Sequence, residues 1–97
     1  MRVVWTELAH EQLDAAMAYI ARDRPATAMR WLEHLLDAAG SLSDFPDLGK
    51  LVEGAKRDDI RELIVSPYRI IYRHDVDRIY VTMVLHDRRD LDVDSLG

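Results

Sequence analysis

Hydrophobic positions follow two different periods along the chain, and the change of period marks the expected elements. Residues 2–6 (RVVWT) form a β-branched and aromatic run that is typical of a strand. From residue 7 to residue 22 apolar side chains recur at helical spacing, and Thr6 can cap the start of this helix. A wider apolar stripe predicts a second helix over residues 25–43, with Pro25 in its first turn.

Three strand-like runs follow a polar loop: IRELIV (60–65), YRIIYRH (68–74) and RIYVTMVLH (78–86). The links between them are short enough for antiparallel hairpins. The order β-α-α-β-β-β therefore predicts an α+β fold, with a helical hairpin packed on one face of a small, mostly antiparallel sheet. Residues 1–97 are long enough for one domain of this kind.

The net charge of −5 is unevenly distributed. Residues 1–49 hold four arginines and eight acidic residues, whereas residues 50–89 hold nine Lys or Arg and seven acidic residues. Strong direct binding of nucleic acid is therefore not expected, because it needs clustered positive charge. There are no cysteines, and no apolar run approaches the ~20 residues of a membrane span. We expect a cytoplasmic protein that binds no membrane.

Several stretches together resemble the RelE/ParE superfamily of bacterial type II toxins. They are Trp5, AAMAYIARDRPATAMRWLEHL (15–35), FPDLGK (45–50), IRELIVSPYRIIYR (60–73) and IYVTMVLHDRR (79–89). The last two look like the ParE-type pattern Arg-Glu-Leu, Pro-Tyr-Arg, Tyr-Arg and His-x-Arg-Arg. The likeness covers about residues 3–91.

The resemblance implies a small toxin that a cognate antitoxin neutralises by direct binding. ParE-like members are known as DNA gyrase inhibitors, and RelE-like members as ribosome-dependent mRNA endoribonucleases. The gyrase reading is favoured here, because the chain has two lysines and no tyrosine after Tyr80, which leaves few groups for acid–base catalysis. The alternatives are a RelE-like nuclease that uses Arg61, His86 and Arg88, and a toxin-derived antitoxin partner without toxicity.

For a binding inhibitor, the candidate target-binding residues are the cations of the last strands and His86. We expect Arg61 to join Arg69 and Arg73 on one sheet face. The alternative for Arg69 and Arg73, slightly favoured for each taken singly, is a structural pairing with Glu62 or with acids on the helices. The full candidate set is Arg61, Arg69, Arg73, His86, Arg88 and Arg89.

Other residues have more ordinary expected roles. Met29, Trp31 and Leu35 are candidates for antitoxin binding, because the apolar stripe of the second helix is wider than one core face requires. Tyr68, Tyr72, Trp5 and Trp31 are expected to pack in the core, and Gly49 and Gly54 to serve turns. His10 and His34 lack the spacing of a metal site. No metal or cofactor is expected.

Overall fold

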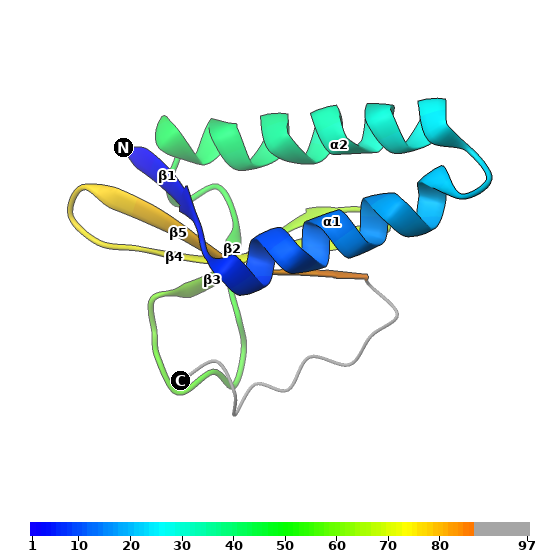
Figure 1. Ribbon diagram of the computed structural model, residues 1–97. Coiled ribbons are helices and arrows are strands. Elements are labelled where there is room, and N and C mark those ends of the chain that lie inside the picture. Colours follow the sequence, from blue (N-terminus) through cyan, green and yellow to red (C-terminus); the bar gives the residue numbers. More distant parts are fainter. Residues whose placement is uncertain (87–97) are drawn as a thin grey trace.

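The computed structural model describes residues 1–86. It contains one mixed sheet of five strands, with the helices on one side (Figure 1). Strand β1 (Arg2–Trp5) runs parallel to β5 (Arg78–His86), and all other neighbours are antiparallel. The order across the sheet is β1-β5-β4-β3-β2, with β4 (Tyr68–His74), β3 (Ile60–Val65) and β2 (Lys50–Leu51). The predicted α+β order is confirmed, and the two-residue strand β2 is an addition to it.

Two helices cover one face of this sheet as a hairpin (Figure 1). Helix α1 (Glu7–Ala21) begins at Thr6, whose side chain accepts a hydrogen bond from the Ala9 N–H, as predicted. Helix α2 (Pro25–Gly40) begins with its proline and ends three residues earlier than predicted, because residues 41–43 form a 3₁₀ turn. In the described part of the chain, neither helix is long and apolar enough to cross a membrane.

The main core lies between the helices and the sheet. Leu13 and Leu35 of the helices meet Ile70 of the sheet there, with 3%, 0% and 0% of their surface exposed. Tyr68 and Tyr72 are buried, and Trp5 and Trp31 are half-buried against this core, so the expected packing roles of all four aromatic residues are confirmed. A smaller core of Ile60, Ile71 and Leu85 lies on the opposite face.

Candidate functional site: the outer sheet face and a helix-side groove

The outer sheet face is the side away from the helices, and it carries Arg69 and Arg73. Arg69 Nη2 donates to Glu62 Oε2 at 2.6 Å, and Lys50 Nζ lies 3.4 Å from Glu62 Oε1. Glu62 is only 8% exposed. Burial acts to raise the pKa of this carboxyl, but the hydrogen bonds and charges of Arg69 and Lys50 outweigh it and lower the pKa. The ionised Glu62 therefore offsets one of the two positive charges that Arg69 and Lys50 bring to this part of the face.

Arg73, at the other end of β4, is held by an acid and by an aromatic ring. Its Nη1 lies 3.7 Å from Asp75 Oδ1, and its guanidinium carbon lies 4.3 Å from the centre of the Tyr80 ring. The second contact is a cation–π arrangement, which covers the flat face of the guanidinium. Both Arg69 and Arg73 therefore pair with an acidic residue, as the alternative expectation stated.

Arg61 lies on the other side of the sheet. The register pairs Arg61 with Tyr72, and alternating residues of β4 put Tyr72 opposite to Arg69 and Arg73. Arg61 Nη1 donates to the Gly49 carbonyl at 2.7 Å, and Nε lies 3.4 Å from Asp47 Oδ1. The expected grouping of three arginines on one face is therefore wrong. The register puts Glu62, and not Arg61, on the face that carries Arg69 and Arg73.

His86 ends strand β5 on the helix side, beside Tyr68, with 5.7 Å between the ring centres. It is far from Arg61. The two residues flank β4 on opposite sides and at positions four residues apart, which corresponds to a backbone separation of roughly 16 Å. The fully buried Ile70 lies between them on the same face. Arg88 and Arg89 lie outside the described residues.

Sequence reasoning missed a polar cluster that fixes the loop before β2. The Tyr72 hydroxyl donates to the Pro46 carbonyl at 2.8 Å and accepts from the Gly49 N–H at 2.8 Å. His74 Nε2 lies 2.9 Å from Asp47 Oδ1, the same carboxylate oxygen that faces Arg61. The only hint in the sequence is a tyrosine in a buried strand position, whose hydroxyl needs a partner. These hydrogen bonds fix the loop of residues 46–49 to strand β4.

Replacing Tyr72 by phenylalanine is expected to lower the free energy of unfolding by about 2 kcal/mol, because the change leaves the Gly49 N–H and the Pro46 carbonyl without this partner. Urea unfolding measures the effect. Tyr80→Phe is the matched control on the neighbouring strand, since no hydrogen bond holds its hydroxyl to the described residues, and it should stay within ~0.5 kcal/mol of the parent chain. Equal losses in both variants would contradict this role of the Tyr72 hydroxyl.

The three residues expected to bind an antitoxin do not share one face of helix α2, because the helix turns some of them towards the core and others towards solvent. Met29 is 57% exposed and Trp31 is half-buried, but Leu35 is fully buried in the main core. Leu35 is therefore unavailable to a partner in this structure, and the prediction that it joins Met29 and Trp31 on an open surface is wrong. The stripe is wide because α2 packs on α1 as well as on the sheet.

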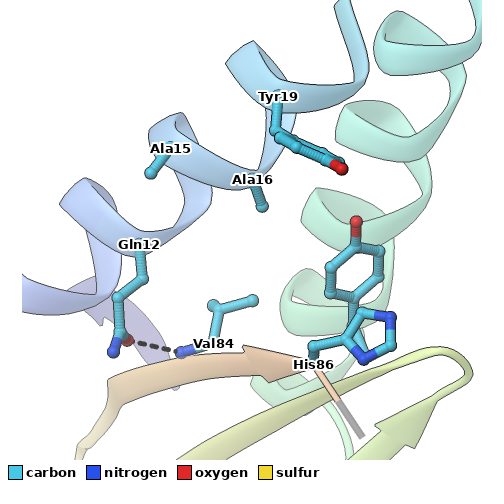
Figure 2. Close-up of a pocket in the computed structure, with 7 residues that line it drawn as sticks. Gln12, Ala15, Ala16, Tyr19, Val84 and His86 are labelled. Atoms are coloured by element: carbon cyan, nitrogen blue, oxygen red, sulfur yellow. Dashed lines mark hydrogen bonds between the residues drawn. The ribbon is translucent and has the colours of Figure 1, made fainter. Parts of the chain in front are cut away.

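A groove crosses the helix side of the molecule, and Trp31, Tyr68 and His86 form its aromatic row. Trp31 meets Tyr68 edge-on at 5.4 Å between ring centres, and Tyr68 meets His86 in the same way. The groove is made of three adjoining hollows. Tyr19 and Tyr68 line both the first and the second hollow, and Thr27 and Trp31 line both the second and the third. Figure 2 shows the first hollow, between helix α1 and the end of β5. Among residues 1–86, no three His, Asp or Glu side chains gather in a way that could hold a metal ion.

Comparison with known proteins decides the family. The model of the family described as "ParE toxin of type II toxin-antitoxin system, parDE" matches residues 3–91. The chain belongs to this family. Toxin RelE2 of Caulobacter vibrioides is 33% identical to this ParE-family chain over 89 residues, which span 91% of this chain and 97% of that protein. Putative toxin Y4kP of Sinorhizobium fredii is 32% identical over 87 residues, which span 88% of this chain and 86% of the relative.

Solved structures share the fold of this ParE-family chain. The chromosomal ParDE system from P. aeruginosa contains a chain with a TM-score of 0.74 and 18% identity, matched over 89% of this chain and 95% of that one. The toxin–antitoxin complex RelBE2 from Mycobacterium tuberculosis gives a TM-score of 0.65 at 24% identity, over 88% and 95% of the two chains. At these identities the likeness concerns the fold.

Proposed function

We propose that this ParE-family toxin inhibits DNA gyrase by binding to it, and that a cognate antitoxin neutralises the toxin. The observation that carries the proposal is the separation of Arg61 from His86. RNA cleavage needs a group that moves a proton and a cation that stabilises the charged phosphorane, both within reach of one phosphate. A backbone separation of roughly 16 Å, with a buried core between, does not provide this.

The outer sheet face supports recognition of a protein better than recognition of a polyanion. Glu62 and Asp75 balance the charges of Arg69 and Arg73, so the face combines both signs with the exposed Ile64. Interfaces between proteins commonly pair a partly apolar patch with arginine and tyrosine side chains. Within this proposal Arg69 and Arg73 contact the target from the outer sheet face. Arg61 and His86 are proposed as further contacts, and so are Arg88 and Arg89, which lie outside the described residues.

An antitoxin partner is supported by the relatives. The similar solved structures come from systems in which a toxin is associated with an antitoxin, namely ParDE of P. aeruginosa and RelBE2 of M. tuberculosis. The exposed apolar side chains of the helical hairpin, Met29 and Leu36 among them, are further support, because such surface is often covered by a partner.

The purified chain is expected to block supercoiling by gyrase and to leave mRNA intact in a translation-coupled cleavage assay. His86→Ala should reduce gyrase inhibition by less than ten-fold, because no bond is broken by its imidazole under this proposal. His10→Ala, which alters a solvent-exposed histidine on α1, is the matched control and should inhibit like the parent chain.

Two outcomes would overturn the proposal. Cut transcripts with normal supercoiling, lost in His86→Ala and kept in His10→Ala, would establish a RelE-like nuclease. Normal growth when the chain is expressed without any antitoxin would instead indicate a toxin-derived partner without toxicity.

A further inference from the structure

The tip of the helical hairpin carries most of the positive charge in the first half of the chain. Residues 15–32 hold three arginines and one acidic residue, whereas the rest of residues 1–49 holds one arginine and seven acidic residues. Arg24 lines the second hollow of the groove and Arg30 lines the third. The acid of this stretch, Asp23, lines the second hollow beside Arg24. The local excess of positive charge therefore favours an anionic ligand at this end of the groove.

The two arginines of these hollows have no acidic partner within the described part of the chain. Three arginines of the sheet pair with acidic side chains, but neither Arg24 nor Arg30 forms an ion pair with any of residues 1–86. Arg30 Nη2 donates a hydrogen bond to the Thr27 hydroxyl at 3.1 Å, which holds the guanidinium beside the third hollow. A guanidinium has five N–H groups, so most of those of Arg30 are left for an anion such as a phosphate.

Aromatic rings line both of these hollows. Tyr19 of α1 and Trp31 of α2 are walls of the second hollow, which has a volume of about 380 Å³. Trp31 also lines the third hollow, of about 310 Å³, beside His34. Tyr68 and His34 contact Trp31 edge-on, with 5.4 and 5.7 Å between ring centres. The Tyr19 ring is 74% exposed and projects from α1 towards the groove (Figure 2). The hollows thus combine a ring that its neighbours hold in place with a ring that is open to solvent.

A nucleotide of a single strand matches this combination of groups. Its base is flat, and its phosphate carries a negative charge. Proteins that bind single strands stack the bases on aromatic side chains and hold the backbone in a positively charged groove. Each hollow is at the lower end of the range for small-ligand pockets, which is ~300–1,000 Å³, so each suits one base. In a duplex the bases are paired and stacked, so only unpaired nucleotides can enter. An acidic peptide would also meet the arginines but would leave the rings without a flat partner.

We propose that the second and third hollows hold neighbouring unpaired nucleotides of single-stranded DNA. The bases lie against Tyr19 and Trp31, and the phosphates lie against Arg24 and Arg30. The inference rests on the proposed function for its setting, because DNA is the substrate of gyrase. It adds a contact with the DNA, on the helix side, to the contact with the enzyme at the outer sheet face. By itself this binding is weak, with a Kd between about 10⁻⁶ and 10⁻⁴ M, because two arginines contribute to it and the whole chain has a net charge of −5.

Arg30→Gln tests the phosphate contact. The probe is a fluorescently labelled oligodeoxythymidylate, and its anisotropy is measured with the purified chain at several salt concentrations. We expect the Kd at low salt to rise about five-fold, and the plot of log affinity against log salt to become less steep by about 0.7, because one phosphate contact is lost. Arg78→Gln is the matched control. It makes the same change at an exposed position of β5 that lines neither hollow, so the Kd should stay within about two-fold of the parent value.

Tyr19→Ala tests the stacking of a base. The side chain of Tyr19 is mostly exposed, so its removal leaves the main core intact. We expect the Kd to rise about ten-fold, because the base loses its aromatic partner on α1. Tyr19→Phe is the matched control, since it keeps the ring and removes the hydroxyl, and its Kd should stay within about two-fold. Circular dichroism reports that each variant is folded.

The inference is overturned if the probe does not bind, if Arg30→Gln and Arg78→Gln bind it equally well, or if Tyr19→Ala binds like Tyr19→Phe. An oligoglutamate that displaces the probe as well as unlabelled oligodeoxythymidylate does would also overturn it, because the hollows would then recognise charge alone. Oligouridylate that binds more than about ten-fold tighter than the DNA probe would overturn the assignment to DNA in favour of RNA. None of these assays contains gyrase, so a failed supercoiling assay leaves the nucleotide site standing. A probe that does not bind leaves the proposed contact between gyrase and the outer sheet face standing.

Discussion

Replacing Gly49 by alanine is expected to lower the free energy of unfolding by about 3 kcal/mol. An added Cβ would lie 2.6 Å from the Glu62 carbonyl oxygen and 2.8 Å from Cε1 of Tyr72. Neither atom can move easily: Glu62 is part of the sheet, and the fully buried Tyr72 ring is held by two hydrogen bonds. The backbone of residue 49 would have to retreat, which breaks the contacts that fix the loop to the sheet.

Gly40→Ala is the matched control for this prediction. Apart from its two chain neighbours and the backbone of its own helix, no atom of the described residues lies within 4 Å of a Cβ added to Gly40 at the end of helix α2. Alanine loses less backbone entropy than glycine on folding, so this variant should be unchanged or more stable by up to ~1 kcal/mol. Urea unfolding followed by circular dichroism compares the two. Similar losses at both positions would show that the close approach at Gly49 is tolerated.

Gly49 also illustrates a limit of sequence reasoning. Both Gly49 and Gly54 were assigned to turns, and Gly54 has a positive φ of 82°, which such turns use. Gly49 has no positive φ; it is required because a strand and a tyrosine ring approach it closely. Those neighbours come from residues 62 and 72, and a local pattern carries no information about them.

The elements of the fold were predictable because local signals agree with the tertiary structure. The runs at 60–65, 68–74 and 78–86 become β3, β4 and β5 with these bounds, and Thr6 and Pro25 begin the helices as expected. Strand β2 was not predicted, because its two residues pair only through contacts with β3. A strand so short has no period of its own.

The candidate site was predictable only as far as alternation within one strand allows. Arg69 and Arg73 share a face as the period of two requires, but the place of Arg61 depends on the register between strands. A shift of one residue would have exchanged Arg61 and Glu62. The prediction that Leu35 lies on an open surface was wrong for a similar reason. The rotation of a helix about its axis is set by what the helix packs against.

Removing the charge of Glu62 is expected to destabilise the fold about as much as Gly49→Ala does. We expect Glu62→Gln to lower the free energy of unfolding by about 3 kcal/mol at pH 7. The carboxylate is 8% exposed and its partner Arg69 has a side chain that is 18% exposed, so glutamine would leave a largely buried guanidinium without its counter-charge. The magnitude is at the low end for a broken buried pair because Arg69 still reaches water. Urea unfolding measures the loss.

Lys50→Gln is the matched control, because it removes the other partner of the same carboxylate. The Lys50 side chain is 68% exposed and its ammonium group lies 3.4 Å from Glu62, which makes the contact a surface ion pair. Such pairs contribute little, so the change should stay within ~1 kcal/mol. A larger loss for Lys50→Gln than for Glu62→Gln would contradict the assignment of Arg69 as the main partner.

The pH dependence separates charge from shape in the Glu62 prediction. The pKa of Glu62 is lower in the folded chain than in the unfolded one, so its ionisation contributes stability above the unfolded pKa. This contribution is lost as the pH falls through the folded pKa, because the protonated carboxyl then resembles the glutamine amide. The difference between the parent chain and Glu62→Gln should therefore be complete at pH 7 and should shrink below about pH 4. A difference that stays constant down to pH 3 would mean that glutamine packs badly, and that the ion pair with Arg69 does not stabilise the sheet.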